Sequence, residues 1–432
     1  MIPWYILGIV AFGLVFLFLF CGIPVAVSLG LVGILTAALF LGHVQALGYA
    51  PWNICTQFIL VAIPLFIFMG QILLHSGISD RLYSGSTALL GRLPGSLLHA
   101  NIASCSIFAA ISGSSVATAA TIGTVAIPEL EKRGYQSRIV LGSLAAGGTL
   151  GILIPPSICM IIYGAMAEES VGQLFIAGVF PGIMLTLLFM GYIAVRVMTQ
   201  PGIAPTFEGM SWKQRVRQII SIWPVAIIMF VVLGGIYLGW TTPTEAAALG
   251  AFISLVFALA YRQLNWQIMK GILRDTVKTT TYIMFLVVGA QLLTGTLSML
   301  RVPDNAVLWV TSLAVSPLAV LMLIYLLYLF LGCFMDGISM MVVTLPVIVP
   351  ILRSLGFDLI WFGVALVILV EMAMLTPPVG LNVYVIHGLR PDRPMSEVFR
   401  GIIPFFFMML LGLIIVTAFP DIATWLPNTM RG

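Results

Sequence analysis

Two segments of the chain place tandem prolines beside glycine and hydroxyl residues: GGTLGILIPPS at 147–157 and MLTPPVGLN at 374–382. Each lies within an apolar stretch, where a proline removes a backbone N–H donor and clashes with the preceding helical turn. A helix must therefore break at both segments and leave carbonyl oxygens without partners. Such oxygens are ligands for a small, hard cation such as sodium, and a helix that starts after a break directs its amides at an anion.

Two further polar segments, ISGSS at 111–115 and MDGIS at 335–339, also interrupt apolar stretches. We expect each to form the tip of a helical hairpin that meets a proline break. These segments offer oxygen ligands, which favour an alkali cation over a soft transition metal. The alternative is that their small residues only let helices pack closely. The predicted sodium ligands are Ser112, Ser115, Gly148, Thr149 and Pro155 in the first half and Asp336, Gly337, Thr376 and Pro377 in the second.

Asp336 and Glu371 are the acidic residues expected well within the membrane, where a carboxylate is costly and is by default a functional hypothesis. They could supply charge to a cation site or carry protons. The two halves of the sequence are related by an offset of 222 residues, described below. At this offset Ser114 corresponds to Asp336, and Thr149 corresponds to Glu371. Since the first half then lacks equivalent acids, sodium coupling is favoured. Glu245, in TTPTEAAALG, is instead expected to cap the start of its own helix.

The composition makes the lipid bilayer the solvent of this protein. Of 432 residues, 61% are apolar and 8% are charged, and the mean hydropathy is +1.14, whereas soluble domains carry about 25% charged residues. The five cysteines are scattered singly, without the spacing of a disulfide framework or metal site. No GxxxxGK[ST] phosphate loop occurs, so neither ATP nor any cofactor besides the coupling sodium is expected. The net charge of +4 does not predict nucleic-acid binding, because the basic residues lie between apolar segments.

Apolar segments long enough to cross about 30 Å of hydrocarbon recur from end to end. Those near 96–131 and 318–352 are expected to be re-entrant helical hairpins, because irregular backbone at membrane depth must face protein or water. With the first residue outside, only Arg301, Arg353 and Arg431 of the 19 Lys and Arg residues fall outside, as the positive-inside rule requires. The ten predicted spans lie near 4–20, 23–41, 52–74, 138–166, 172–198, 218–240, 243–261, 276–300, 358–388 and 400–426.

The two halves of the sequence are similar at a nearly constant offset. With a shift of 222 residues, the pair Pro155 and Pro156 falls on Pro377 and Pro378. Since each half holds five spans, the second repeat must be upside down relative to the first, which is the design of secondary transporters. The sequence thus predicts an all-α integral membrane protein of about ten transmembrane helices, two re-entrant hairpins and two inverted repeats. The first repeat covers 1–205, a cytoplasmic linker covers 206–217, and the second repeat covers 218–432.

Together these segments resemble the large membrane subunit of tripartite ATP-independent periplasmic (TRAP) transporters, within the wider ion-transporter superfamily. The similarity extends over essentially the whole chain. The resemblance implies an elevator mechanism, in which a mobile domain of both hairpins and both broken helices carries substrate and sodium across a fixed scaffold. The segments that carry it are SIFAAISGSSVATAATIG at 106–123, GGTLGILIPPSICMIIYG at 147–164, GGIYLGWTTPTEAAALGA at 234–251 and LTPPVGLNVYVIHGL at 375–389.

The resemblance also implies two partners, a periplasmic substrate-binding protein and a small four-span membrane subunit on a separate chain. The implied function is sodium-coupled import of an organic acid, such as a C4-dicarboxylate or sialic acid, across the bacterial inner membrane. Neither hairpin tip carries Arg or Lys, so amides, hydroxyls and helix ends would hold the carboxylate. The residues expected at the substrate are Ser114, Ser115, Pro156, Ser157, Pro378 and Asn382.

Three other functions are open at this stage. A proton-coupled carrier of organic anions would use Asp336 and Glu371. An enzyme would need a metal-binding cluster or a nucleophile with its base, and none occurs at a recognisable spacing, so we do not expect one. A channel would show no saturable uptake that depends on a soluble binding protein.

Overall fold

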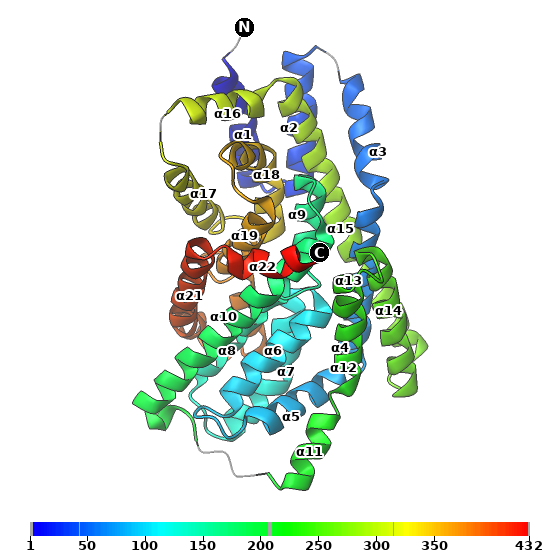
Figure 1. The fold of residues 1–432 in the computed structure, drawn as a ribbon, viewed down its shortest axis with the longest axis vertical. Helices are drawn as coiled ribbons and strands as arrows, with labels where there is room; N and C mark the ends of the chain where they lie inside the picture. The colour runs from blue at the N-terminus through cyan, green and yellow to red at the C-terminus, as the bar shows by residue number, and fades with distance from the viewer. Residues whose placement is uncertain (1–2, 43, 206–209, 314, 431–432) are drawn as a thin grey trace.

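The computed structural model describes residues 3–42, 44–205, 210–313 and 315–430; residues 206–209 of the predicted linker and Arg431 lie outside this range. All regular structure in the described part is helical, as predicted (Figure 1). The first half forms α1 (Trp4–Phe20), α2 (Val25–Phe40), α3 (Tyr49–Cys55), α4 (Ala62–His75), α5 (Ile78–Leu90), α6 (Leu97–Ser112), α7 (Ser115–Lys132), α8 (Ser137–Thr149), α9 (Ile158–Ala167) and α10 (Val171–Thr199). The second half forms α11 (Trp212–Ile220), α12 (Trp223–Met229), α13 (Gly235–Tyr237), α14 (Pro243–Ala260), α15 (Trp266–Met299), α16 (Val302–Ser312), α17 (Pro317–Leu331), α18 (Gly337–Ser354), α19 (Leu359–Ala373), α20 (Leu381–Leu389), α21 (Met395–Ala418) and α22 (Asp421–Thr429).

Seven helices of the described residues are long and apolar enough to cross a membrane. Large apolar side chains lie exposed on many helices; Leu187 on α10 and Leu323 on α17, for example, are 61% and 68% exposed. Hydrocarbon is the solvent that such surfaces require, because it demands no hydrogen bonds from them. The chain is therefore a multi-pass integral membrane protein, as its composition predicts.

The two expected spans near 138–166 and 358–388 are each divided into two helices. After α8, a 3-10 turn at Leu150–Ile152 leads into an irregular segment, and α9 begins only at Ile158. Likewise, α19 ends at Ala373 and α20 begins at Leu381. Both breaks predicted from the tandem prolines are confirmed.

The same elements recur in both halves at the predicted offset. Helices α7 and α18 each have 18 residues and begin at Ser115 and Gly337, which are 222 positions apart. The turns that follow them contain Gly134 and Gly356, both with a φ of +79°, a left-handed conformation that glycine adopts without steric cost. Because an equivalent left-handed turn ends each of these helices, the repeat exists in the backbone as well as in the sequence.

Helices α6 and α7 form a hairpin whose outer ends lie together at one end of α10. Gly95, before α6, packs against Ile193 near the end of α10, and the Gln136 amide, after α7, donates to the Ile203 carbonyl just beyond it. The second hairpin, formed by α17 and α18, lies in the other half of the molecule (Figure 1). There Arg353 at the end of α18 donates to the Ala167 carbonyl, at 3.0 Å, near the start of α10. The two hairpins therefore approach from opposite ends of a 29-residue helix.

Several element boundaries differ from the prediction. Helix α15 begins ten residues earlier than expected, at Trp266, because Asn265 caps it. The last expected span ends at Ala418, and α22 is a separate helix after Pro420. The described end of the predicted linker is helical, since Ser211 caps α11. A short helix, α5 or α16, directly precedes each of the two hairpins in the chain.

Glu245 occupies the capping position that its sequence context predicts. Its carboxylate accepts hydrogen bonds of 2.8 Å from both the amide and the hydroxyl of Thr242, and the Thr242 hydroxyl accepts from the Glu245 amide. This reciprocal capping box satisfies amides at the start of α14 that no helical carbonyl can reach.

Two groups of helices make up the packing. Helix α15 packs against α2 and α4, and α14 packs against α4, whereas α6 to α10 and α18 to α21 form a second group that includes both proline breaks. Glycines bring backbones into contact within each group. A Cβ on Gly289 of α15 would lie 2.3 Å from the Ala26 carbonyl oxygen of α2, and one on Gly142 of α8 would lie 2.3 Å from the Gly401 carbonyl oxygen of α21. Only glycine permits such backbone contact.

Gly289→Ala should destabilise the protein by about 1–3 kcal/mol, because the new methyl group would force α15 away from α2. Thermal unfolding in detergent, followed by loss of a monodisperse chromatographic peak, would measure this change. The matched control is Gly271→Ala on the same helix, where no atom lies within 4 Å of the added carbon. An equal melting temperature for the two variants would contradict the close contact.

Candidate functional site

The tip of the first hairpin packs directly onto the first proline break. The Ser115 hydroxyl donates to the Thr149 carbonyl oxygen at 3.0 Å. Gly151 lies so close to Ser114 that an added Cβ would approach its carbonyl to 2.7 Å, and a Cβ on Gly113 would lie 2.9 Å from the Pro156 carbonyl oxygen. Small residues at both places therefore let irregular backbone from two elements meet inside the protein.

Local hydrogen bonds hold the shape of this tip. Gly113 adopts a left-handed φ of +61°, which ends α6, and the Ser114 hydroxyl caps α7 by accepting from the Ala117 amide at 3.4 Å. The Ser112 and Thr118 hydroxyls lie 2.9 Å apart, and the Thr118 hydroxyl also donates to the Ser114 carbonyl oxygen at 2.8 Å. These bonds fix the positions of several oxygen atoms before any ligand arrives.

The second hairpin tip uses a carboxylate where the first uses a hydroxyl. Asp336 caps α18: one oxygen accepts from the Ser339 amide at 3.1 Å and the other accepts from the Ser339 hydroxyl. Gly337 packs against Val370 of α19, and Tyr282 of α15 lies beside Asp336. The second tip thus contacts the helix that precedes the second break.

The two breaks share backbone geometry but differ in burial. Both tandem prolines contain a cis peptide bond, Pro155–Pro156 and Pro377–Pro378. The first pair is buried, whereas the second pair is exposed. At the first break, the Ser157 hydroxyl caps α9 and donates to the Ile152 carbonyl oxygen.

At the second break, the Thr376 carbonyl oxygen accepts from the Gly380 amide at 3.0 Å, and the Thr376 hydroxyl donates to the Met372 carbonyl oxygen at 2.7 Å. The irregular segment is therefore closed by its own short hydrogen bonds. Backbone groups within it that make no such bond are available to a ligand.

Both tips and both breaks border one cavity of about 160 Å³. The first residues of four helices line it: Ser115 of α7, Ile158 of α9, Gly337 of α18 and Leu381 of α20. A helix N-terminus carries about half a positive charge and unpaired amides. The remaining lining comes from Gly113, Ser114, Val116, Ile152, Cys159, Thr279, Ile283, Asp336, Ile338, Val370 and Met374. Helix ends of this kind favour an anion, and no Lys or Arg is among the described residues of the lining.

The predicted site residues fall into two sets. Ser114, Ser115, Asp336 and Gly337 line the cavity. The others do not line it: Gly148, for example, packs against Ala119, and Pro377 and Pro378 are exposed. Those that do not line it are Ser112, Gly148, Thr149, Pro155, Pro156, Ser157, Thr376, Pro377, Pro378 and Asn382.

Asn382 joins the two halves of the molecule and does not face the cavity. Its fully buried side chain donates to the Ala145 carbonyl oxygen of α8 at 3.2 Å.

A second contact between the halves lies where α7 and α20 end, since Arg390 pairs with Glu131 and with Asp392. The bidentate hydrogen bonds from Arg390 lower the pKa of the exposed Asp392 to about 2.

The sequence analysis missed the cavity wall that α15 provides. Thr279 and Ile283 lie one helical turn apart on this helix and face the cavity from the other packing group. The polar run KTTTY at 278–282, inside an otherwise apolar helix, is the signal that could have identified it. Which of these residues faces the hairpins could not be read from that run alone.

Glu371 is fully buried in α19, and neither of its carboxylate oxygens has a hydrogen-bond partner among the residues that the structure describes. The Leu153 amide at the first break is close enough to influence it, as is Cys159 in the cavity wall. A buried carboxylate without a partner requires either a proton or a cation. Glu371, in the second half of the chain, therefore lies beside the first break.

Comparison with known proteins places this geometry in a family. Residues 12–422 match the family described as "Tripartite ATP-independent periplasmic transporter, DctM component". The chain is 38% identical over 405 residues to the C4-dicarboxylate TRAP transporter large permease protein DctM of Pseudomonas aeruginosa, covering 93% of this chain and 94% of that protein. It is 31% identical to the sialic acid TRAP transporter large permease protein SiaM of Vibrio cholerae, covering 96% and 97%.

Two further relatives broaden the comparison. The isethionate TRAP transporter permease protein DctMQ of Oleidesulfovibrio alaskensis is 32% identical, with 96% of this chain and 65% of that protein covered. The crystal structure of the Alcanivorax borkumensis YdaH transporter has a similar fold, with a TM-score of 0.58, 16% identity and coverage of 88% and 86%. The family match over nearly the whole chain, together with relatives above 30% identity, shows that this protein belongs to the DctM family of TRAP transporter large permeases and is not an enzyme.

Proposed function

We propose that this protein is the large permease subunit of a sodium-coupled TRAP transporter that imports an organic acid, such as a C4-dicarboxylate, sialic acid or a similar carboxylate. The observation that carries the proposal is the convergence of four helix N-termini and two oxygen-rich tips on one cavity. This geometry supplies electropositive amides for a carboxylate and oxygen ligands for a small cation at the same place.

The organic anion would bind at the helix ends. Ser114 and Ser115 would contact it directly, because both line the cavity. The other predicted substrate residues would shape the pocket from behind; Ser157, for example, fixes the start of α9. These others are Pro156, Ser157, Pro378 and Asn382. The relatives differ in the acids they are named for, so a C4-dicarboxylate, sialic acid and isethionate are the probes to compare.

Sodium would bind where each tip meets its break. In the first half, the sodium ligands would be oxygens of Ser112, Ser115, Gly148, Thr149 and Pro155. In the second half, the ligands would be oxygens of Asp336, Gly337, Thr376 and Pro377. Contact between tip and break, such as that of Ser115 with Thr149, supports this assignment. Asp336 supplies the one carboxylate among the described lining residues, which suits a monovalent cation.

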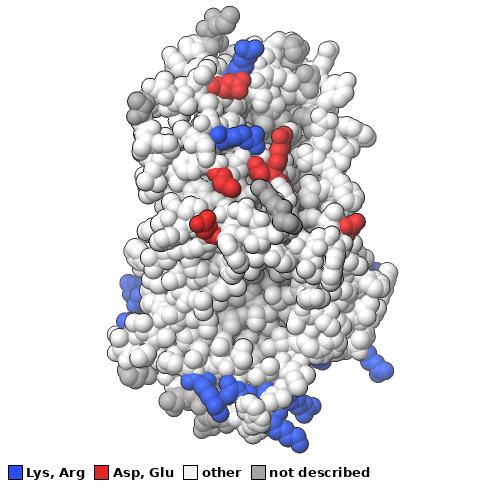
Figure 2. Space-filling view, viewed as in Figure 1, with Lys and Arg blue, Asp and Glu red and all other residues white. Residues whose placement is uncertain are grey.

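The membrane arrangement we propose has ten spans, two re-entrant hairpins and two inverted repeats, with the bounds 1–205, 206–217 and 218–432. The opposite approach of the hairpins along α10 supports it. Figure 2 shows most of the visible Lys and Arg in the half that ends at α11, whereas the visible Asp and Glu lie in the other half beside a few basic side chains. By the positive-inside rule the basic end would be cytoplasmic, and the bacterial relatives support a bacterial inner membrane.

Transport would proceed by an elevator movement. The cavity is bounded by α15 on one side and by the hairpins and breaks on the other, so it lies between the two packing groups. A group that contains both hairpins and both breaks could slide along α2, α4, α14 and α15 and carry its ligands with it. A periplasmic binding protein would deliver the acid, and a small membrane subunit would widen the fixed group. The family description as tripartite, and the name DctMQ of one relative, support these two partners.

Sodium-driven uptake is the first test. Proteoliposomes would contain this chain, its small membrane subunit and its binding protein, and radiolabelled succinate, N-acetylneuraminate and isethionate would be offered in turn. We expect an inward sodium gradient at symmetric pH to drive uptake of at least one acid. Omission of the binding protein is the control and should abolish uptake.

The charge on Asp336 is expected to be required for sodium binding. Sodium at about tenfold its Kd should stabilise the wild type by about 1.4 kcal/mol relative to choline at equal ionic strength, and Asp336→Asn should lose most of this increment. The shift in melting temperature in detergent measures it without any knowledge of the substrate.

Asp358→Asn is the matched control for that variant. Asp358 caps α19 by accepting from the Trp361 amide at 2.9 Å, as Asp336 caps α18, but it does not line the cavity. Asparagine caps helices as well as aspartate does, so both variants should fold. Equal sodium stabilisation of the Asp336→Asn variant and the wild type would place the cation elsewhere.

A proton-coupled carrier of organic anions is the second candidate, and the buried, unpartnered carboxylate of Glu371 is the observation that favours it. In that mechanism Asp336 and Glu371 would carry the protons. A pH gradient without sodium would then drive uptake, and Glu371→Gln would abolish it. Uptake that requires sodium and survives Glu371→Gln would reject this candidate.

A further inference from the structure

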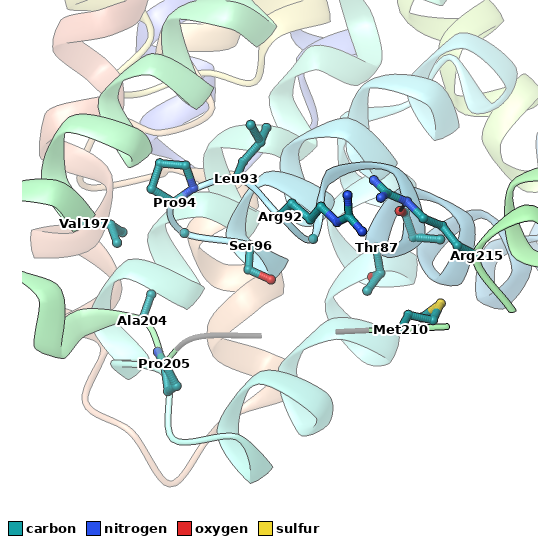
Figure 3. A pocket seen from close by; sticks show the side chains of 13 residues that line it. Thr87, Arg92, Leu93, Pro94, Ser96, Val197, Ala204, Pro205, Met210 and Arg215 are labelled. Atoms are coloured by element: carbon teal, nitrogen blue, oxygen red, sulfur yellow. Dashed lines mark hydrogen bonds between the residues drawn. The ribbon is translucent and has the colours of Figure 1, made fainter. Parts of the chain in front are cut away.

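A second cavity, of about 430 Å³, lies at the end of the molecule that carries α11. Figure 3 shows the side chains around it. They come from the end of α5, from the segment 91–96 that leads into α6, from α10 near Val197, and from Arg215 of α11. The rest of the described lining is Ala204, Pro205 and Met210, on either side of residues 206–209, which the structure does not describe. The cavity therefore joins α5 and α11 to the first hairpin, and it is separate from the site between the tips.

Two arginines give this cavity its charge. Arg92 and Arg215 both line it, and Figure 3 shows their guanidinium groups directed toward one another. Arg215 donates to the Ala88 and Leu89 carbonyl oxygens, at 2.6 and 3.0 Å, which leaves part of its five-donor fork free. Arg92 forms no hydrogen bond or ion pair with any described residue. No acidic side chain is among the described residues of the lining.

Two buried hydroxyls in the same lining also lack partners. Ser96 and Thr87 are 3% and 8% exposed, and neither side-chain oxygen has a hydrogen-bond partner among the described residues. Ser96 stands at the N-cap of α6, yet its hydroxyl does not cap that helix. Leaving such groups unsatisfied costs free energy, so their presence beside two convergent guanidinium groups indicates a ligand that accepts hydrogen bonds. Guanidinium forks, hydroxyls and a helix N-terminus together match a phosphate group.

The surroundings place this cavity at the depth of lipid headgroups. Helix α11 has no buried residue, and it exposes apolar Trp212 and Ile220 as well as basic Lys213 and Arg217. A basic amphipathic helix of this kind lies in the membrane interface. The rim of the cavity includes the exposed Leu93, which could contact an acyl chain.

We propose that this cavity binds the phosphodiester headgroup of an anionic phospholipid from the cytoplasmic leaflet. The headgroup would bridge Arg92, which precedes the first hairpin, and Arg215 on α11, while Ser96 and Thr87 donate to its oxygens. A bound lipid would thereby fix the start of the hairpin to α5 and α11. The proposal does not depend on the identity of the transported acid or of the coupling ion.

The test compares lipid retention by variants of the full chain. The protein is incorporated into nanodiscs of phosphatidylglycerol and phosphatidylcholine, extracted into detergent, and examined by native mass spectrometry for bound phosphatidylglycerol. We expect Arg92→Gln to retain about fivefold less phosphatidylglycerol than the wild type, which corresponds to one arginine at an anionic surface. Arg217→Gln is the matched control, because it removes the same charge from α11 outside the cavity, and it should retain the wild-type amount.

Two further measurements keep the proposal open to refutation. Thr87→Val removes the hydroxyl at nearly constant volume and should also reduce the retention of phosphatidylglycerol. This second variant tests the site independently if Arg92→Gln fails to fold. Retention by Arg92→Gln and Thr87→Val equal to the wild type would overturn the site. Inorganic phosphate, added to the wild type in detergent, should not displace the lipid; if it does so at millimolar concentration, a soluble phosphate is the occupant and the lipid assignment is wrong.

Discussion

The constraint on which this structure depends is the need to satisfy the backbone of helices that break inside a membrane. Hydrocarbon offers no hydrogen bonds, so each irregular segment must be enclosed by protein, water or a ligand. The first break meets this requirement through the tip of the first hairpin, where Ser115 bonds to the Thr149 carbonyl and Gly113 and Gly151 allow backbone contact. Between the tips and the breaks, a cavity remains where four helices begin.

The two halves meet this constraint differently, and the difference gives the site its charge. Ser114 and Asp336 are equivalent N-caps of α7 and α18, but only the second is a carboxylate. The first proline pair is buried and the second is exposed. The two equivalent positions therefore present one neutral and one acidic tip to the same cavity. Glu371 adds a buried carboxylate that has no equivalent in the first half, since Thr149 occupies that position.

Polar groups outside the central cavity follow the same rule at the membrane surface. Arg215 satisfies carbonyls at the end of α5, and Glu245 satisfies amides at the start of α14. Arg92, Ser96 and Thr87 differ from these two because no described residue satisfies them, and they lie together in one cavity. Such a group of donors suits the proposed lipid headgroup.

The sequence by itself determined the membrane class, the proline breaks, the hairpin tips and the 222-residue repeat, because hydropathy, proline chemistry and spacing act locally along the chain. It also identified Ser114, Ser115, Asp336 and Gly337, which line the cavity. Only the tertiary structure decided that Thr279 and Ile283 complete the wall, that Asn382 joins the halves, and that Arg92 and Arg215 converge. These relations depend on how helices far apart in the chain pack and rotate against each other. No local pattern encodes that rotation, because a membrane helix is apolar on nearly every face.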